Sequence, residues 1–288
     1  MDIQHSTGQK LELHTIVDQY SGACIEAQLL EKETVVKRSA RVTWREAQNT
    51  LRAGFSAWDT LPESVQTDGE PSLIGRAGWD FPSDFTLWLI GLGISHSVIR
   101  SGRCTDNAEV ERGHRTVNDY AIVGQEKQPI CDLQFVVHQA ARDLAFSLPS
   151  RAKECNGQAP VMAYPALLDA PRPYQLQQEL ALFDLDHVDA FLAKFQWQRS
   201  VNKNGVVQLG GQSRRYYIGR KFAYQQVQIF FDSDDRHLVF YDADDLELCR
   251  KPIRGLTEFE LIGMDDPDVA LVPQQLSLFP DVLKGVNC

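Results

Sequence analysis

A stretch rich in proline, between positions 149 and 180, divides this sequence into two parts with different patterns. Proline has no backbone N–H and its ring collides with the preceding helical turn, so repeated prolines exclude a continuous helix. We therefore predict an extended linker over 149–180, between domains at 1–148 and 181–262, with 263–288 as a flexible tail. A chain of 288 residues is long enough to give both domains a buried core. The prolines are Pro149, Pro160, Pro165, Pro171 and Pro173.

The first part alternates between strands and helices. Its apolar pattern predicts strands at 1–4, 10–18 and 23–30, and Thr43 with Glu46 forms a capping box that begins a helix over 43–58. A strand at 64–67, a helix at 85–92, a strand at 94–99 and a helix at 107–122 follow. This order is typical of an α/β fold in which helices flank a mixed sheet.

The second part is rich in short strands. After a helix at 186–195, we predict strands at 206–209, 215–218, 227–231, 238–241 and 246–249. The turns between them contain glycine or aspartate. Five closely spaced strands with tight turns predict a small, all-β barrel domain.

Three carboxylates are candidates for a metal site. Asp2 lies on the first predicted strand, Asp68 at the end of the fourth, and Glu111 in the first turns of the helix over 107–122. Mg²⁺ and Mn²⁺ prefer oxygen ligands, and a pair of such ions activates the attacking oxygen and stabilises the leaving one in phosphoryl transfer. The three residues are therefore candidates for the catalytic and metal-binding groups of a two-ion site.

Other acidic residues compete for these roles. Asp18 ends a strand beside a turn and is an alternative first carboxylate, although an aspartate there usually caps backbone N–H groups. Asp80 and Asp84 flank a turn and are alternatives for the second, with helix capping as their other role. Glu109 points about 160° away from Glu111 on a helix, so that one of the two faces the site.

The sequence around these carboxylates resembles the DDE transposases and retroviral-type integrases. Residues 106–116 (Asp-Asn-Ala-Glu-Val-Glu-Arg-Gly-His-Arg-Thr) resemble the Asn-Gly-x-x-Glu-Arg-x-His-Arg-Thr helix of insertion-sequence transposases. Residues 67–71 (Thr-Asp-Gly-Glu-Pro) resemble their Asp-Asn-Gly-Pro stretch, and 92–94 (Leu-Gly-Ile) their Leu-Gly-Ile strand entry. Residues 1–4 (Met-Asp-Ile-Gln) resemble the first integrase strand. Between Asp68 and Glu111 lie 111 − 68 − 1 = 42 residues, a spacing normal for the family.

This resemblance covers residues 1–148 and implies an RNase H-like core. It implies that Asp2, Asp68 and Glu111 bind the two metal ions, and that the protein cleaves DNA at 3′ ends and transfers the ends into target DNA. It also implies homo-oligomers, because two DNA ends must be processed together. The sequence departs from the family at Asn107-Ala108 and at Asp68-Gly69-Glu70, and neither change removes a metal ligand.

Two other functions fit the same residues. In the family, a helix-turn-helix segment precedes the first strand, whereas Asp2 here directly follows Met1. A catalytically inactive, truncated remnant that acts as a DNA-binding protein is therefore the alternative. A hydrolytic nuclease with the same fold is the third reading, and the helix at 107–122 favours the transposase.

Basic residues cluster in spite of a formal net charge of −10. DNA binding depends on the local placement of Lys and Arg, so the acidic total does not exclude it. Around the carboxylate helix, Asn107, Arg112, His114 and Arg115 are predicted DNA contacts. In the second domain the predicted contacts are Arg214, Arg215, Arg220 and Lys221, and 205–207 with 216–219 resemble the C-terminal barrel of Mu-type transposases.

A short motif stands in the predicted tail. Residues 275–279 (Gln-Leu-Ser-Leu-Phe) resemble the pentapeptide by which bacterial replication and repair proteins dock on the sliding clamp. An extended segment offers an amide for hydrogen bonding and apolar anchors for a pocket. We expect clamp binding through Gln275, Leu276, Leu278 and Phe279, with packing of the tail on its own domain as the alternative.

No apolar run approaches the ~20 residues that span a bilayer. The six cysteines are scattered, without the spacing of a zinc site. These features predict a cytoplasmic protein with no membrane partner, and the resemblance to transposases implies that it is associated with the nucleoid.

Overall fold

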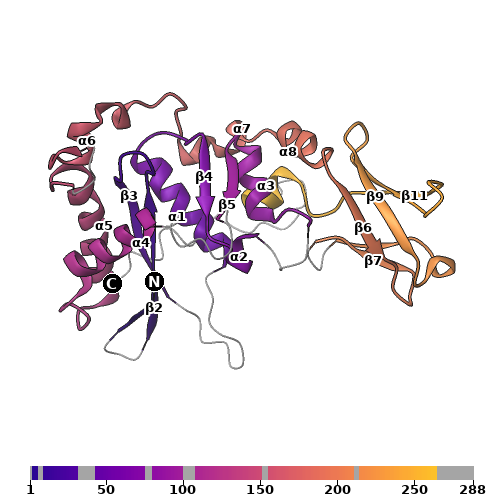
Figure 1. The fold of residues 1–288 in the computed structure, drawn as a ribbon, viewed down its shortest axis with the longest axis horizontal. Coiled ribbons are helices and arrows are strands. Elements are labelled where there is room, and N and C mark those ends of the chain that lie inside the picture. Colours follow the sequence, from indigo (N-terminus) through magenta and orange to yellow (C-terminus); the bar gives the residue numbers. More distant parts are fainter. Residues whose placement is uncertain are drawn as a thin grey trace, which may run out of the picture. The chain divides into compact units, whose positions relative to one another are not determined.

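The computed structural model describes residues 2–5, 9–31, 43–74, 80–99, 108–150, 155–210 and 214–264. The chain forms two compact units, each built from segments that are separated in the sequence. The first unit contains the described residues of 1–62 and 99–176, and the second contains those of 63–98 and 177–264. The second unit therefore combines residues from before and after the proline-rich stretch (Figure 1).

Unit 1 is built on a three-stranded antiparallel sheet. Its strands are β1 (Asp2–Gln4), β2 (Lys10–Val17) and β3 (Cys24–Glu31), in the order β1-β2-β3. Leu11 pairs with Ile3 and Leu13 with Leu29, so that these apolar side chains share one face. Leu11 and Leu13 are fully buried. The three predicted strands are confirmed.

Helices cover both faces of this sheet (Figure 1). Helix α1 (Trp44–Ala57) packs on one face, where Thr50 Oγ1 donates to Gln28 Oε1 at 3.0 Å. The predicted capping box of Thr43 and Glu46 begins this helix. On the other face, α4 (Ala108–Val117) and α5 (Ile130–Phe146) pack against the buried apolar residues of β2 and β3.

Helix α4 continues into a π-helix, η2 (Asn118–Ile122), so the predicted helix over 107–122 is present in its described part. Helix α5 is an addition to the prediction. Its buried residues recur at spacings of three and four, the period of one helix face. They are Leu133, Val137, Ala140, Ala141 and Ala145.

The described residues of the proline-rich stretch form short helical turns rather than an extended linker. Helix α6 (Pro160–Ala163) and the 3₁₀ turn η4 (Pro165–Leu168) each begin at a proline, whose fixed φ and missing N–H suit the first helical position. Val161 packs with Ala23 and Ala145, and Tyr174 lies edge-on to Phe55. These contacts make 155–176 part of unit 1. The 3₁₀ turn η5 (Leu176–Gln178) leads into unit 2.

Unit 2 contains a second, parallel sheet of β4 (Ser64–Thr67) and β5 (Ser95–Val98). Helices α2 (Pro71–Ile74) and α3 (Asp84–Gly91) lie between them in the sequence. The apolar face of α3 is buried, and Trp88 Nε1 donates to Glu179 Oε1 at 2.8 Å. A side-chain carbon at Gly91 would lie 2.2 Å from the Phe183 ring, so this glycine allows the close approach.

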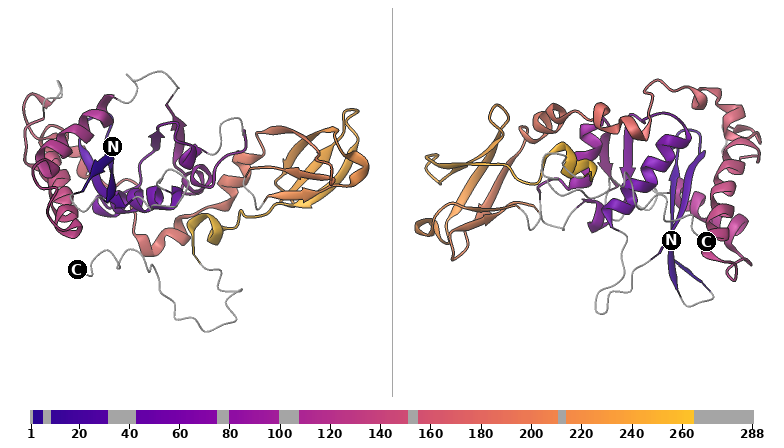
Figure 2. Two further views of the ribbon diagram at one scale, coloured as in Figure 1. Left: turned by 90° about the horizontal axis from the view of Figure 1, so that it is seen from below. Right: turned by 180° about the vertical axis from the view of Figure 1, so that it is seen from behind.

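The C-terminal part of unit 2 is an open sheet and not a closed barrel. After α7 (Glu179–Leu182) and α8 (Leu185–Leu192), the chain forms a sheet of four antiparallel strands in the order β11-β10-β9-β6. These strands lie in the orange part of the ribbon in Figure 2. They are β6 (Gln196–Ser200), β9 (Gln226–Asp232), β10 (His237–Tyr241) and β11 (Glu247–Pro252). The remaining two, β7 (Val206–Gln208) and β8 (Arg215–Tyr217), pair with each other, with the turn η6 (Arg220–Phe222) after them.

The predicted barrel is therefore wrong. Pairing β7 with β8 in a separate ribbon leaves β6 and β11 at the edges of the four-stranded sheet, with no described strand to close it. A terminal helix, α9 (Glu258–Ile262), follows the sheet and begins at a capping box of Thr257 and Glu260.

The protein is a mixed α/β protein, with antiparallel pairing among β1, β2 and β3 and parallel pairing of β4 with β5. In the described chain these strands belong to two hydrogen-bonded sheets rather than to the single predicted sheet. No helix within the described ranges is both long and apolar enough to cross a membrane.

Candidate functional site

The first predicted carboxylate lies on the short strand β1. The backbone of Asp2 pairs with Glu12 of β2, while its side chain is outside the described part of the structure. Directly opposite residues of an antiparallel pair present their side chains on the same face. Glu12 is therefore a further carboxylate at the position that pairs with residue 2, and the hairpin register is the signal that would have found it in the sequence. Its Oε1 lies 3.7 Å from His14 Nε2.

Helix α4 presents the third predicted carboxylate to solvent. Glu111 is half-exposed, and its Oε2 lies 3.9 Å from Arg115 Nη2, one turn along. An exposed pair of this kind contributes little to stability, so the carboxylate remains available to a ligand. The helix approaches β2 closely at Gly113, where an added side-chain carbon would lie 2.8 Å from Val17 Cγ2.

The other predicted contacts of this helix differ in exposure. Arg112 and Arg115 are exposed, whereas His114 is partly buried beside the sheet. Burial lowers the pKa of His114 to about 4, with His14 acting in the same direction and Glu12 against it. His114 is therefore neutral at pH 7. Asn107 lies outside the described residues, as does the side chain of Glu109.

The second predicted carboxylate follows β4 in unit 2. Asp68 is exposed, and its Oδ1 accepts a hydrogen bond from Glu70 N at 3.2 Å. The residue before it, Thr67, is held by His96 of the neighbouring strand β5 through a hydrogen bond of 2.9 Å to Nε2. The other ring nitrogen, Nδ1, lies 2.9 Å from Thr86 Oγ1 on α3. His96 therefore joins the end of β4 to α3, a role that the sequence did not indicate.

This histidine makes stability depend on pH. Burial lowers the pKa of His96 to about 4, below the ~6.5 of an unfolded histidine. The unfolded chain therefore takes up a proton first as the pH falls. The contribution of His96 to stability is complete above pH ~6.5 and is lost between ~6.5 and 4.

We expect the free energy of unfolding of the wild type to fall by about 1 kcal/mol more than that of His96→Asn between pH 7 and pH 5, after allowance for partial exposure. Urea titrations at the two pH values measure this difference. His187→Asn, which changes an exposed histidine, is the matched control. Equal pH dependence of the wild type and His96→Asn would contradict the expectation.

The competing carboxylates have structural partners. Asp18 Oδ2 accepts from Ser21 N at 2.7 Å and from Ser21 Oγ at 2.6 Å, which confirms its role in the turn. Asp80 forms an ion pair with Arg199, and Asp84 one with Arg214.

Of the basic residues in unit 2, Arg215, Arg220 and Lys221 are exposed, whereas Arg214 is buried. Arg214 binds Asp84, and it donates to the carbonyl oxygens of Arg254 at 3.2 Å and Gly255 at 2.9 Å. Its Nε and Nη2 donors are used within the protein and the side chain is buried, so the predicted DNA contact at Arg214 does not fit the structure and is not retained.

Asp68 of unit 2 and Glu111 of unit 1 each offer exposed carboxylate oxygens, the kind of ligand that hard divalent cations prefer. Among the side chains that the structure describes, no three His, Cys, Asp or Glu residues are grouped so as to hold a metal ion. The side chain of Asp2 is not among them. The clamp-like residues 275–279 also lie outside the described part.

No protein-family model and no curated protein matches this chain. Among solved structures, it is similar to retroviral integrases. The HTLV-2 integrase catalytic core domain in complex with magnesium has a TM-score of 0.40 and 16% identity, over 57% of this chain and 90% of the other. The BIV integrase catalytic core domain has a TM-score of 0.40 and 15% identity, over 57% of this chain and 90% of the other. The simian T-cell lymphotropic virus intasome, in complex with PP2A regulatory subunit B56 gamma, has a TM-score of 0.43 and 14% identity. This match covers 88% of this chain and 74% of the other.

Proposed function

We propose that this protein is the catalytic part of a DDE-type transposase or integrase, which cleaves DNA at 3′ ends and joins them into target DNA by metal-dependent phosphoryl transfer. The observation that carries the proposal is helix α4. It bears the Glu-Arg-x-His-Arg-Thr motif, packs on β2 through Gly113, and leaves Glu111 half-exposed. In the element order β1-β2-β3-α1-β4-α2-α3-β5-α4-η2-α5, Asp2 belongs to β1, Asp68 follows β4 and Glu111 belongs to α4.

In this proposal Asp2, Asp68 and Glu111 hold two Mg²⁺ or Mn²⁺ ions. Ions bound there would activate the attacking oxygen and stabilise the leaving one. The chain's own part is to hold the carboxylates on ordered elements. Glu111 is presented by a helix, and Asp68 follows a strand end that His96 holds through Thr67.

The basic residues would hold the DNA backbone. Arg112 and Arg115 lie one position and one turn from Glu111, so they would contact phosphates beside the reacting bond. In unit 2, Arg215, Arg220 and Lys221 would give DNA contact without base recognition. We include Asn107 and His114 in the site on the motif alone, and we expect a homo-oligomer, in which two DNA ends are processed together.

A joining assay tests this function without knowledge of the DNA ends. The full chain is incubated with supercoiled plasmid, Mg²⁺ or Mn²⁺, and a pool of short duplexes with randomised ends, and the junctions are sequenced. We expect junctions between duplex 3′ ends and the plasmid that disappear with EDTA. Bound DNA without junctions would instead support the DNA-binding remnant, and nicks without junctions would support a hydrolytic nuclease.

The tail motif predicts a separate interaction. We expect residues 275–279 to bind a bacterial sliding clamp, because two apolar anchors in an extended segment fit a pocket. Leu278→Ala with Phe279→Ala should weaken binding at least ~10-fold, since buried anchors dominate such contacts. Surface plasmon resonance on immobilised clamp measures this, with Ser277→Ala as the control. Unchanged affinity in the double variant would exclude the motif.

A further inference from the structure

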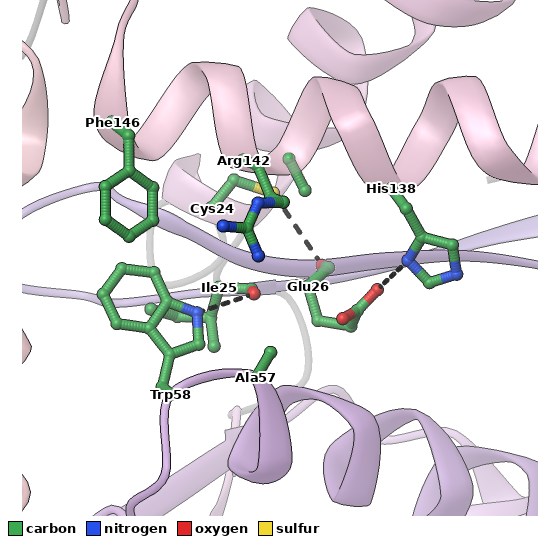
Figure 3. Close-up of a pocket in the computed structure, with 9 residues that line it drawn as sticks. Cys24, Ile25, Glu26, Ala57, Trp58, His138, Arg142 and Phe146 are labelled. Atoms are coloured by element: carbon green, nitrogen blue, oxygen red, sulfur yellow. Dashed lines mark hydrogen bonds and ion pairs between the residues drawn. The ribbon is translucent and has the colours of Figure 1, made fainter.

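Unit 1 contains a cavity of about 250 Å³ between β3, the end of α1 and α5 (Figure 3). This volume is below the ~300 Å³ at which pockets for drug-sized ligands begin, so it suits a smaller molecule. Its main lining residues are Cys24, Glu26, Trp58, His138, Arg142 and Phe146. None of them belongs to the proposed catalytic site.

One side of the cavity is aromatic. The rings of Trp58 and Phe146 are stacked, with centroids 5.4 Å apart and an interplanar angle of 27°. Trp58 Nε1 donates to Ile25 O at 2.9 Å, and this hydrogen bond fixes the indole (Figure 3). The pair therefore forms a preorganised apolar wall, which an aliphatic or aromatic group can contact without reordering the protein.

A buried carboxylate faces the same cavity. The Glu26 side chain is 8% exposed, and its Oε1 accepts from Ala27 N at 3.0 Å and lies 2.6 Å from His138 Nδ1. Its second oxygen, Oε2, has no hydrogen-bond partner among the described residues and points away from His138 (Figure 3). A carboxylate oxygen at a cavity wall can accept a hydrogen bond from a ligand, and a bond from a charged donor is stronger than one from a neutral donor.

The guanidinium of Arg142 completes the set. It extends from α5 toward Trp58 and Phe146, and its carbon lies 5.8 Å from the Phe146 ring centroid (Figure 3). Within the described ranges it forms no hydrogen bond or ion pair, and in particular none with Glu26. The cavity is thus lined by one carboxylate oxygen, Glu26 Oε2, and one guanidinium, Arg142, that have no hydrogen-bond partner among the described residues.

Both charges are matched by a molecule that carries an ammonium and a carboxylate a few bonds apart. We propose that this cavity binds a free α-amino acid with an apolar side chain, whose ammonium donates to Glu26 Oε2, whose carboxylate accepts from Arg142, and whose side chain lies against Trp58 and Phe146. Cys24 at the cavity wall takes no part in bond formation, because burial raises the pKa of its thiol to about 12 and keeps it protonated. The binding is reversible and independent of the proposed DNA chemistry.

Calorimetry on the full chain tests this with three probes of similar shape: L-phenylalanine, phenethylamine, which lacks the carboxylate, and 3-phenylpropanoate, which lacks the ammonium. We expect saturable binding of one L-phenylalanine, and each analogue to bind at least ~10-fold more weakly, because each loses one charge-assisted hydrogen bond. Equal affinity for all three probes, or no binding of L-phenylalanine to folded protein, would overturn the proposal.

The variants should show a crossed pattern. Glu26→Gln should weaken the binding of L-phenylalanine at least ~10-fold and leave the affinity for 3-phenylpropanoate unchanged. Arg142→Gln should weaken the binding of L-phenylalanine and leave the affinity for phenethylamine unchanged. Asp132→Asn, which removes an exposed carboxylate of the same helix outside the cavity, should change none of the three. Arg142 is exposed, so its variant keeps the test decisive if Glu26→Gln does not fold. A uniform loss for all probes in Arg142→Gln would contradict the assigned contact.

Discussion

Replacing Asp68 by Asn, or Glu111 by Gln, is expected to abolish saturable Mn²⁺ binding and to lower the rate of DNA joining at least ~1000-fold. Each change keeps the size of the side chain and removes one anionic oxygen ligand. Loss of metal-based stabilisation of the transition state amounts to several kcal/mol, and each ~1.4 kcal/mol corresponds to a factor of ten in rate. Calorimetry with Mn²⁺ and the joining assay measure the two effects on the same preparations.

The control for this experiment is Asp80→Asn, which tests the competing assignment from the sequence. Asp80 forms an ion pair with Arg199, and the Asp80 side chain is exposed to solvent. Loss of this ion pair should therefore leave metal binding and DNA joining unchanged. Circular dichroism confirms that all variants are folded, as expected for the exposed positions 68 and 111. If both variants keep metal binding and joining within threefold of the wild type, the three-carboxylate site is wrong. If the folded wild type binds no metal, DNA binding without catalysis becomes the better account.

The second large effect separates two adjacent arginines. Arg214→Met should lower the free energy of unfolding by about 3 kcal/mol, because it leaves Asp84 without its charged partner and the carbonyl oxygens of Arg254 and Gly255 without a donor. Arg215→Met changes an exposed side chain, so its effect on stability should stay within ~0.5 kcal/mol. Urea unfolding followed by tryptophan fluorescence measures both.

DNA affinity should show the reverse order. Arg215→Met should weaken binding and reduce by about one the slope of log affinity against log salt concentration, as expected for one lost phosphate contact. Folded Arg214→Met should keep the slope of the wild type. An unstable Arg215→Met, or a changed salt slope in Arg214→Met, would contradict the burial that distinguishes the two side chains.

Elements whose signal is local were predictable from the sequence. The capping box at Thr43 and Glu46 and the alternation along β2 depend on neighbouring residues, and both are confirmed. The sequence of helix α5 has an apolar period of three to four, which is a local signal for a helix. Strand β6 had a weaker signal, because Trp197 is its one strongly apolar residue, and this side chain is buried beside Phe81, far away in the sequence.

Features that depend on distant partners were not predictable in this way. Arg214 and Arg215 have nearly the same local sequence, and the burial of Arg214 is decided by Asp84, 214 − 84 = 130 residues earlier. Glu26 and His138 are 138 − 26 = 112 residues apart, and nothing near either residue indicates the other. The barrel failed for the same reason. The five predicted strands correspond to β7–β11, but their pairing was not specified by their own residues, and β6 was not predicted.

The contact of α3 with α7 has a consequence for how the chain is made on the ribosome. Trp88 and Gly91 are covered by Glu179 and Phe183, which are synthesised 183 − 91 = 92 residues later than Gly91. At ~5–20 residues per second, the apolar face of α3 emerges roughly 5 to 20 seconds before its partner exists. During that interval the nascent chain exposes the apolar face of this helix, so we expect a chaperone to bind this segment during synthesis. A shortened chain that ends before α7 should therefore aggregate, even though every residue of α3 is present.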